Sequence, residues 1–305
     1  MTTFDARPRE PDLVASIRET SQELVRLSGV RGGDDVLPMA LRAFRAAGHT
    51  LGKGDHPRAV ERDLIAATGE LGEVTAWLAY DADRQDVSRQ VIHEALVLSR
   101  RAGDRDMERF ELTHLAMQSV HLHRPAEALR ITRGFPDGCL PPRVEAVLAI
   151  REGRALAQLG QAGDALAELA RARSILLDGV AARDPYWTWW VDDAEVLWHT
   201  GMAHAQLGDW AGAIPKLREA VRLRGASQRR ARFNDTVYLL NALVHVGDWR
   251  EAEPVLRDAV RRMDEVSSAI ITNVLRRVAD RIAGSDAPST VADLADEVRR
   301  AARAG

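Results

Sequence analysis

Small and apolar residues recur along the chain at intervals that fit helices packed in pairs. The plainest unit spans residues 184–222, and its small residues are spaced 7, 5 and 7 apart: Gly201, Gly208, Ala213 and Ala220. Two helices cross closely only where their side chains are small, and Gly208-Asp209 supplies a turn between them. The stretch therefore predicts two antiparallel helices joined by a tight turn.

The same spacing occurs five times between residues 57 and 262. The turns of the five copies fall at Asp83, His123, Gly160, Gly208 and Gly247. Seven residues before each turn, the first helix carries Ala76, Ala116, Gly153, Gly201 or Leu240. After each turn, the second helix carries a pair of residues seven apart: Ser88 and Ala95, Ala128 and Phe135, Ala165 and Ala172, Ala213 and Ala220, or Ala252 and Ala259. Helix pairs repeated at such intervals are typical of α-solenoids, in which each pair stacks on its neighbours.

Composition supports an all-α fold and excludes several classes of protein. Of the 305 residues 46% are hydrophobic and only 5% aromatic, which suits a large core built from helices. A net charge of −3 gives no broad basic face for nucleic acid. The single cysteine, Cys139, cannot form an internal disulfide, and we find neither an apolar run long enough to span a membrane nor a signal sequence. We therefore expect a cytoplasmic protein with no membrane partner.

Two segments, LGDWAGAIPKLREAV and VGDWREAEPVLRDAV, resemble tetratricopeptide repeats (TPRs). Four further segments, in this order, resemble the C-terminal sensory region of actinobacterial Cro/repressor-family (XRE-type) transcriptional regulators: IRETSQELVRLSGVRGGDDVLPMAL, EVTAWLAYDADRQ with EALVLSRRAGDRD, PYWTWWVDDAEV and RMDEVSSAIITNVLRRVADRI. The resemblance covers residues 12–282 and implies a scaffold that senses a ligand or partner. Those regulators begin with a DNA-binding helix-turn-helix domain, and this sequence starts where that domain would end.

One segment resembles part of a DNA-binding helix-turn-helix domain. Ser21–Val30, SQELVRLSGV, looks like the opening of a helix-turn-helix, in which Ser-Gln begins the helix before the turn. The continuation GGDDVLPMALRAF contains Pro38 and an apolar face instead of a polar recognition helix. We therefore expect no direct DNA binding.

These observations predict an all-α fold, a TPR-like right-handed superhelix of antiparallel helix pairs. We expect residues 1–11 to form a flexible leader and residues 12–305 a single helical repeat domain. Within that domain, 12–56 form N-terminal helices, 57–262 the five helix pairs, and 263–305 C-terminal capping helices. In such a superhelix the first helix of each pair lines the concave surface.

The sequence offers no catalytic, metal or cofactor site. His114 and His121 are two helical turns apart without a third ligand for zinc, and His199 and His204 point to different faces of their helix. Carboxylates such as Asp192, Asp193 and Glu195 fit helix capping, Cys139 fits a loop, and the basic run Arg222–Phe233 fits a solvated turn.

Tryptophans are concentrated in the same central region. Trp210 and Trp249 each follow a Gly-Asp turn, so we expect them to pack between adjacent helices. Trp187, Trp189 and Trp190 cannot all face one core, so at least one of them is free to line a pocket.

On each first helix, the small or apolar residue seven positions before the turn faces the second helix of the pair. The residue that follows it is then directed toward the concave surface. Two more residues join this row: Glu73, one turn before Trp77, and Trp198, one turn before Met202. The predicted binding residues are therefore Glu73, Trp77, Met117, Arg154, Trp198, Met202 and Asn241. An asparagine can hydrogen-bond a peptide backbone, and an arginine can bind a carboxylate. Alternatively, Trp77 and Trp198 fill core between neighbouring pairs.

The sequence thus predicts a non-catalytic regulatory protein, linked to transcription, that binds a peptide or partner protein in a concave groove. The alternative is a small-molecule binder or an enzyme built on the same scaffold, which requires a buried cluster of ionisable residues that the linear sequence does not reveal. The sequence leaves open whether the chain forms a homodimer.

Overall fold

The computed structural model describes residues 10–54, 57–135 and 140–304, and over these ranges the chain is helical, without a strand. The first six α-helices are α1 (Glu10–Arg31), α2 (Gly33–Lys53), α3 (Arg58–Asp81), α4 (Gln85–Ala102), α5 (Arg105–His121) and α6 (Pro125–Thr132). The central ones are α7 (Pro142–Gln158), α8 (Ala162–Leu177), the 3₁₀ helix η1 (Tyr186–Trp190), α9 (Asp193–Gln206) and α10 (Trp210–Leu223). The last are α11 (Arg229–Val246), α12 (Trp249–Met263), α13 (Ala269–Ala283) and α14 (Ser289–Ala304). The all-α prediction is confirmed; Cys139 and most of the expected leader lie outside the described ranges.

The five predicted turns are confirmed by their backbone conformation. Asp83, His123, Gly160, Gly208 and Gly247 all adopt a left-handed conformation, with φ between 53° and 80°. Glycine takes this conformation without steric cost, whereas Asp83 and His123 adopt it at positions where most side chains are disfavoured. The helix pairs are therefore closed by the same turn geometry even where the glycine is missing.

The close helix crossings also fall at the predicted small residues. A Cβ atom placed on Gly201 would lie 2.6 Å from Leu217 Cγ and 3.3 Å from the Ala213 carbonyl oxygen, across the α9–α10 pair. A Cβ on Gly153 would lie 2.9 Å from the Ala165 carbonyl oxygen, across the α7–α8 pair. Glycine at both positions lets the paired helices approach one another.

The second copy departs from the predicted pattern. Its second helix, α6, ends at Thr132, so Phe135 lies beyond the helix that was expected to contain it. Gly134 and Pro136 flank Phe135 in the sequence, and both residue types disfavour the continuation of a helix.

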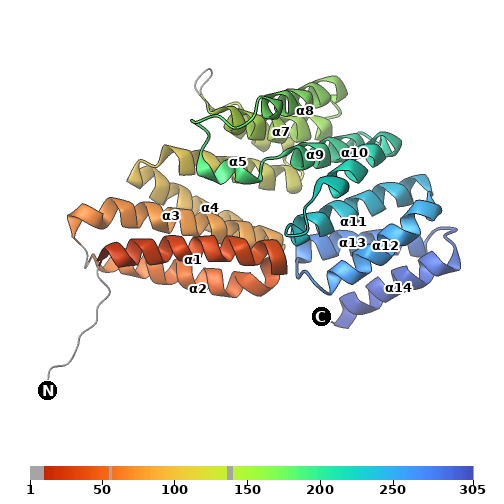
Figure 1. Cartoon of the computed structure of the whole chain (residues 1–305), viewed down its shortest axis with the longest axis horizontal. Helices are drawn as coiled ribbons and strands as arrows, with labels where there is room; N and C mark the ends of the chain where they lie inside the picture. Colours follow the sequence, from red (N-terminus) through yellow and green to blue (C-terminus); the bar gives the residue numbers. More distant parts are fainter. Residues whose placement is uncertain (1–9, 55–56, 136–139, 305) are drawn as a thin grey trace.

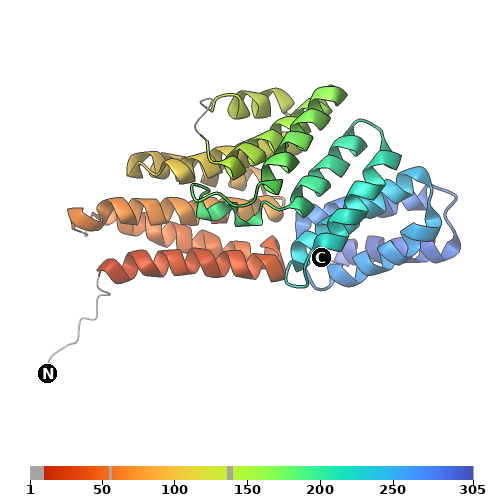
Figure 2. The same ribbon diagram turned by 45° about the horizontal axis from the view of Figure 1, so that its top comes forward.

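The helix pairs stack in chain order into a right-handed, TPR-like superhelix, seen along one face in Figure 1 and turned in Figure 2. Its winding brings the junction of α1 and α2 beside the junction of α12 and α13. There the Asp34 amide donates to the Ser267 carbonyl (3.2 Å), and the Ser267 amide donates to the Arg31 carbonyl (2.7 Å). These two hydrogen bonds join the N-terminal helices to the C-terminal helices. No helix among the described residues is long and apolar enough to cross a membrane.

The N-terminal boundary is a second difference from the sequence prediction. Helix α1 already begins at Glu10, within the expected leader of residues 1–11. Helix α2 follows after Gly32, which occupies the cap position, so Asp34 and Asp35 lie in the first turn of the helix and do not cap it.

Candidate binding site on the concave face

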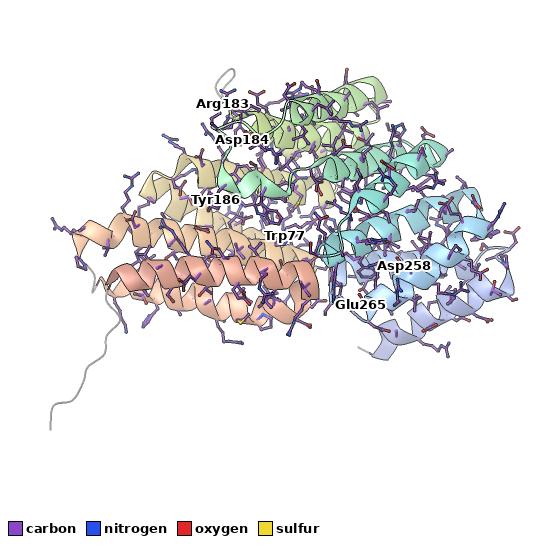
Figure 3. The ribbon with its side chains drawn as sticks, viewed as in Figure 1. Trp77, Arg183, Asp184, Tyr186, Asp258 and Glu265 are labelled. Atoms are coloured by element: carbon purple, nitrogen blue, oxygen red, sulfur yellow. The ribbon has the colours of Figure 1, made fainter. Side chains whose placement is uncertain are left out.

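Aromatic and cationic side chains from four first helices meet on the concave side of the superhelix. We call this set the inner cluster: Trp77 and Tyr80 of α3, Arg154 of α7, Trp198 of α9, and Arg230 and Tyr238 of α11. Figure 3 places Trp77 near the middle of the molecule, between the N-terminal and C-terminal helices.

On the N-terminal side the cluster is built around Trp77. Its ring stacks on Tyr80, with 5.7 Å between centroids, and the Arg230 guanidinium lies 4.7 Å from its centroid. His114 of α5 approaches both rings edge-on and lies with its Nδ1 3.1 Å from Glu73 Oε1. Glu73 is thus held by His114 and is only 4% exposed.

On the C-terminal side the cluster is built around Trp198. The Arg154 guanidinium lies 5.7 Å from the Trp198 ring, and Tyr238 meets the same ring edge-on at 5.4 Å. Arg154 Nη1 lies 3.2 Å from Nδ1 of His199. The indole nitrogen of Trp198 is buried without a hydrogen-bond partner among the described residues.

A network of ion pairs lies next to this side of the cluster. Arg224, at the end of α10, donates to Glu195 (2.9 Å) and to Asp235 (2.8 Å). Burial pushes the pKa of Glu195 upward, but hydrogen bonding to His199 and the charge of Arg224 outweigh it and hold that pKa below its usual range. Burial lowers the pKa of His199 to about 3, so its imidazole is neutral at pH 7.

This network corrects two predictions from the sequence. Asp192 does cap α9, since it accepts from the Glu195 amide at 2.8 Å, but the Glu195 side chain pairs with Arg224 and His199. The basic run Arg222–Phe233 is not simply a solvated turn, because Arg224 is 5% exposed. These side chains are buried because they pair with residues that are distant in the sequence. The local sequence pattern does not show such partners.

A shallow hollow of about 390 Å³ adjoins the cluster. It is lined by Met202, Ala205, Gln206, Gly208, Trp210 and Asn241. Met202 follows Trp198 by one helical turn on α9, and Asn241 follows Tyr238 by one turn on α11, so the hollow continues the aromatic surface. The Asn241 amide makes none of the side-chain hydrogen bonds found in the described part of the chain.

The structure distributes the seven predicted binding residues over three environments. Glu73, Trp77, Arg154 and Trp198 belong to the inner cluster or contact it. Met202 and Asn241 line the hollow, whereas Met117 is half-buried on α5 and lines neither. Arg154 is only 8% exposed, so its side chain is part of the interior.

Sequence reasoning missed several residues of the site. Tyr80 and Arg151 lie three residues after Trp77 and three before Arg154, on the same helix faces, so helical spacing could have found them. Arg230 and Tyr238 come from α11, and no local pattern ties them to α3 or α9.

The other tryptophans are mainly structural. Trp187 is 3% exposed, stacks on Phe110 with 4.4 Å between centroids, and donates to the Asp106 carbonyl at 3.1 Å. Trp189 is 65% exposed. Trp210 and Trp249 pack against the C-terminal core, as predicted.

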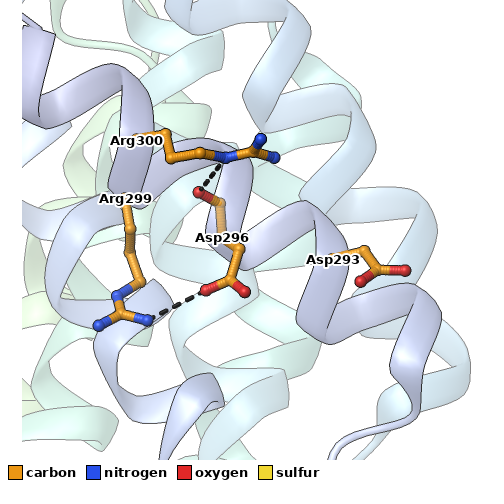
Figure 4. Close-up of a pocket in the computed structure, with 4 residues that line it drawn as sticks. All are labelled: Asp293, Asp296, Arg299 and Arg300. Carbon is orange, nitrogen blue, oxygen red and sulfur yellow. Dashed lines mark hydrogen bonds and ion pairs between the residues drawn. The ribbon is translucent and has the colours of Figure 1, made fainter.

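Two further arrangements were considered as sites. Over the described ranges, no three His, Cys, Asp or Glu side chains are grouped to hold a metal ion. A hollow on α14, shown in Figure 4, is lined by Asp293, Asp296, Arg299 and Arg300. Arg299 donates to the Asp296 carboxylate (3.0 Å) and to Asp280 of α13 (3.1 Å), and Arg300 donates to the Asp296 carbonyl (3.2 Å). It is therefore an ordinary charged surface.

Comparison with known proteins supports the fold. No family model matches the chain, and no curated protein sequence matches it. Among solved structures, a Rap protein complexed with Competence and Sporulation Factor matches with a TM-score of 0.53 and 10% identity, covering 94% of this chain and 97% of that one. The TPR domain of P58(IPK) gives 13% identity and a TM-score of 0.23 over 95% of this chain and 84% of that one. The chain thus has a TPR-like α-solenoid fold.

Proposed function

We propose that this chain is a non-catalytic regulatory protein that binds a peptide or a segment of a partner protein on its concave face. The observation that carries the proposal is the continuity of the hollow with the inner cluster. Over one continuous surface, half-buried Trp198 and Tyr238 provide apolar contact area, and Asn241 provides an amide with a free donor and acceptor. Grooves that bind extended peptides combine these two elements.

Two further points favour a binding role. The Rap protein that shares this fold was solved in complex with Competence and Sporulation Factor, so a scaffold of this shape accommodates a second molecule. The order of sequence motifs resembles the sensory region of XRE-type regulators, which is why we place the function in transcription-linked signalling. We propose that DNA contact, where it occurs, is made by a partner.

The proposal is tested by identifying what the protein retains from extracts of its own cells. The immobilised chain should retain a specific peptide or protein, and the double variant Met202→Ala/Asn241→Ala should bind it at least tenfold more weakly, about 1.4 kcal/mol. Gln90→Ala, an exposed change on the outer helix α4, is the matched control and should bind as the unmodified protein does. Undiminished binding by the double variant would place the site elsewhere.

A small-molecule binder is the second candidate, and a specific observation favours it. The fold buries ionisable groups from several helices around His199, among them Arg151, Arg154 and Glu195, as a site for a compact polar ligand requires. Native mass spectrometry of the purified protein separates the two candidates, because a small ligand adds a single mass of a few hundred daltons that unfolding releases. A retained peptide instead yields a sequence.

A further inference from the structure

Two buried arginines of α7 lie side by side without a carboxylate of their own. Arg151 and Arg154 are three residues apart on one helix face and are 4% and 8% exposed. Arg224 and Arg230 pair with carboxylates, but none of the ion pairs found within 4.0 Å among the described residues includes Arg151 or Arg154. A buried charge is costly unless it is paired, so these two guanidiniums require an explanation.

His199 lies between the two guanidiniums and cannot satisfy both. Its Nε2 is 3.0 Å from Arg151 Nη1, and its Nδ1 is 3.2 Å from Arg154 Nη1. A neutral imidazole accepts at one nitrogen only. Since Nε2 also lies 3.2 Å from Glu195 Oε1, where an N–H must donate, Arg151 faces a donor. The Nε atoms of both arginines are likewise buried without partners in the described part of the chain.

Several polar groups around the pair have no hydrogen-bond partner among the described residues. The Arg154 guanidinium lies over the Trp198 ring, 5.7 Å from its centroid, and the indole N–H of Trp198 is buried without a partner in the described part of the chain. The hydroxyls of Tyr80 and Tyr238 make no side-chain hydrogen bond over the described ranges, and both phenols act on the charge of Arg154. Burial lowers the pKa of Arg154 to about 10, which still leaves it charged at neutral pH. The Glu195 carboxylate acts on the charge of Arg151 but is bonded to His199 and Arg224, and neither guanidinium of the pair has an ion-pair partner within 4.0 Å over the described ranges.

We propose that Arg151 and Arg154, with the Trp198 indole N–H, form a binding site for a carboxylate of the peptide that occupies the concave face. The inference rests on the proposed binding function and names the chemistry that this site selects. Guanidinium groups bind carboxylates through paired, charge-assisted hydrogen bonds, and an indole N–H can complete the set. The carboxylate comes either from an Asp or Glu side chain or from the C-terminus of the peptide, while the neighbouring residue lies in the hollow of Met202 and Asn241.

Three pools of random hexapeptides test this assignment on the immobilised protein. One pool lacks Asp and Glu but has a free C-terminal carboxylate, one contains Asp and Glu but is amidated, and one is amidated and lacks both residues. Mass spectrometry of the retained peptides should show at least tenfold enrichment from one of the first two pools over the third. The enriched pool identifies the source of the carboxylate.

Variants tie the selection to the arginines. Arg154→Gln should lose the enrichment, and Trp198→Phe, which removes one donor and no charge, should reduce it. Arg257→Gln changes an exposed arginine on α12 and should retain the enrichment. If the unmodified protein retains the three pools equally, or if Arg154→Gln keeps the selectivity, the carboxylate site is wrong although the peptide-binding function stands.

If no pool is retained, the proposed peptide function fails, and a measurement with simple anions decides the site separately. The thermal midpoint of the unmodified protein in sodium succinate should exceed that in sodium chloride of equal ionic strength by a few degrees, because a bound anion stabilises the folded state. Sodium phosphate serves as the comparison anion. Arg154→Gln should lose this difference between the two salts, whatever its own thermal midpoint without added anion. Equal anion responses in the two proteins would overturn the site, and Arg151→Gln replaces Arg154→Gln if the latter does not fold.

Discussion

The guanidinium of Arg230 and the carboxylate of Asp81 form a buried ion pair, Nε to Oδ1 at 2.8 Å, between segments 149 residues apart. The same carboxylate accepts from Ser268 Oγ (2.7 Å) at the start of α13 and from the Gly33 amide (2.7 Å) at the start of α2. One fully buried side chain at the end of α3 thereby joins the N-terminal helices to α11 and to the start of α13. It fixes the winding that brings the inner cluster together.

Asp81→Asn should therefore lower the free energy of unfolding by about 3–5 kcal/mol, because it leaves Arg230 buried without a counter-charge. Chemical denaturation measures the change. Glu219→Gln, which breaks an exposed pair with Arg222, is the control and should cost no more than about 1 kcal/mol. Equal midpoints for the two variants would show that the Asp81 network does not hold the superhelix together.

Gly201→Leu should force α9 away from α10, since even a Cβ atom at this position would lie 2.6 Å from Leu217 Cγ. Overpacking of this kind typically costs about 1–3 kcal/mol, and contact with the Ala213 carbonyl adds to it. Gly163→Leu is the matched control, because nothing lies within 4 Å of its added Cβ on α8. A drop in thermal midpoint for Gly201→Leu that is absent for Gly163→Leu confirms the crossing; equal midpoints contradict it.

The repeat register was predictable because it depends on short-range rules. In each pair the turn lies seven residues after one small residue and five residues before another. This spacing determines where the chain reverses and where the two helices cross, as Gly201 and Ala213 show. Where the rule failed, at Phe135, the sequence contained Gly134 and Pro136, whose effect on the helix could have been weighed. Local physical chemistry therefore accounts for most of the element order.

The candidate site was less predictable because its partners are brought together by the superhelical winding. The predicted row of Trp77, Arg154 and Trp198 follows from helical spacing, but the burial of Arg154 depends on contacts with other helices. Pairing of Asp81 with Arg230 joins residues for which no spacing rule exists. Hence the sequence indicated the order of the helices and could not indicate which charges would lack partners.

Glu111 provides a test through pH. It is fully buried on α5, accepts from Ser99 Oγ at 2.7 Å, and burial raises its pKa to about 9 from an ordinary 4.5. A raised carboxyl pKa means that the folded state binds the proton more tightly, so its contribution to stability is complete below about pH 4.5 and is lost as the pH rises toward about 9.

Glu111→Gln should consequently resemble the unmodified protein at about pH 5 and become increasingly more stable than it between about pH 6 and 9. Thermal midpoints measured across this range provide the comparison. Glu94→Gln, an exposed change on α4, corrects for general effects of removing one negative charge. A constant difference between Glu111→Gln and the unmodified protein at every pH would show that Glu111 does not carry the proton.

Weak affinity for duplex DNA is the last expected outcome. The segment Ser21–Val30, which resembles the opening of a helix-turn-helix, lies inside the single continuous helix α1, so it contains no turn to present a recognition helix. In the basic run, Arg224 and Arg230 are engaged by buried carboxylates and are not free for phosphates. Anisotropy titrations with labelled duplexes at physiological salt should give dissociation constants no tighter than the non-specific range of about 10⁻⁴–10⁻⁶ M. Sequence-dependent binding at about 10⁻⁸ M or tighter would contradict this and would make the chain a DNA-binding protein in its own right.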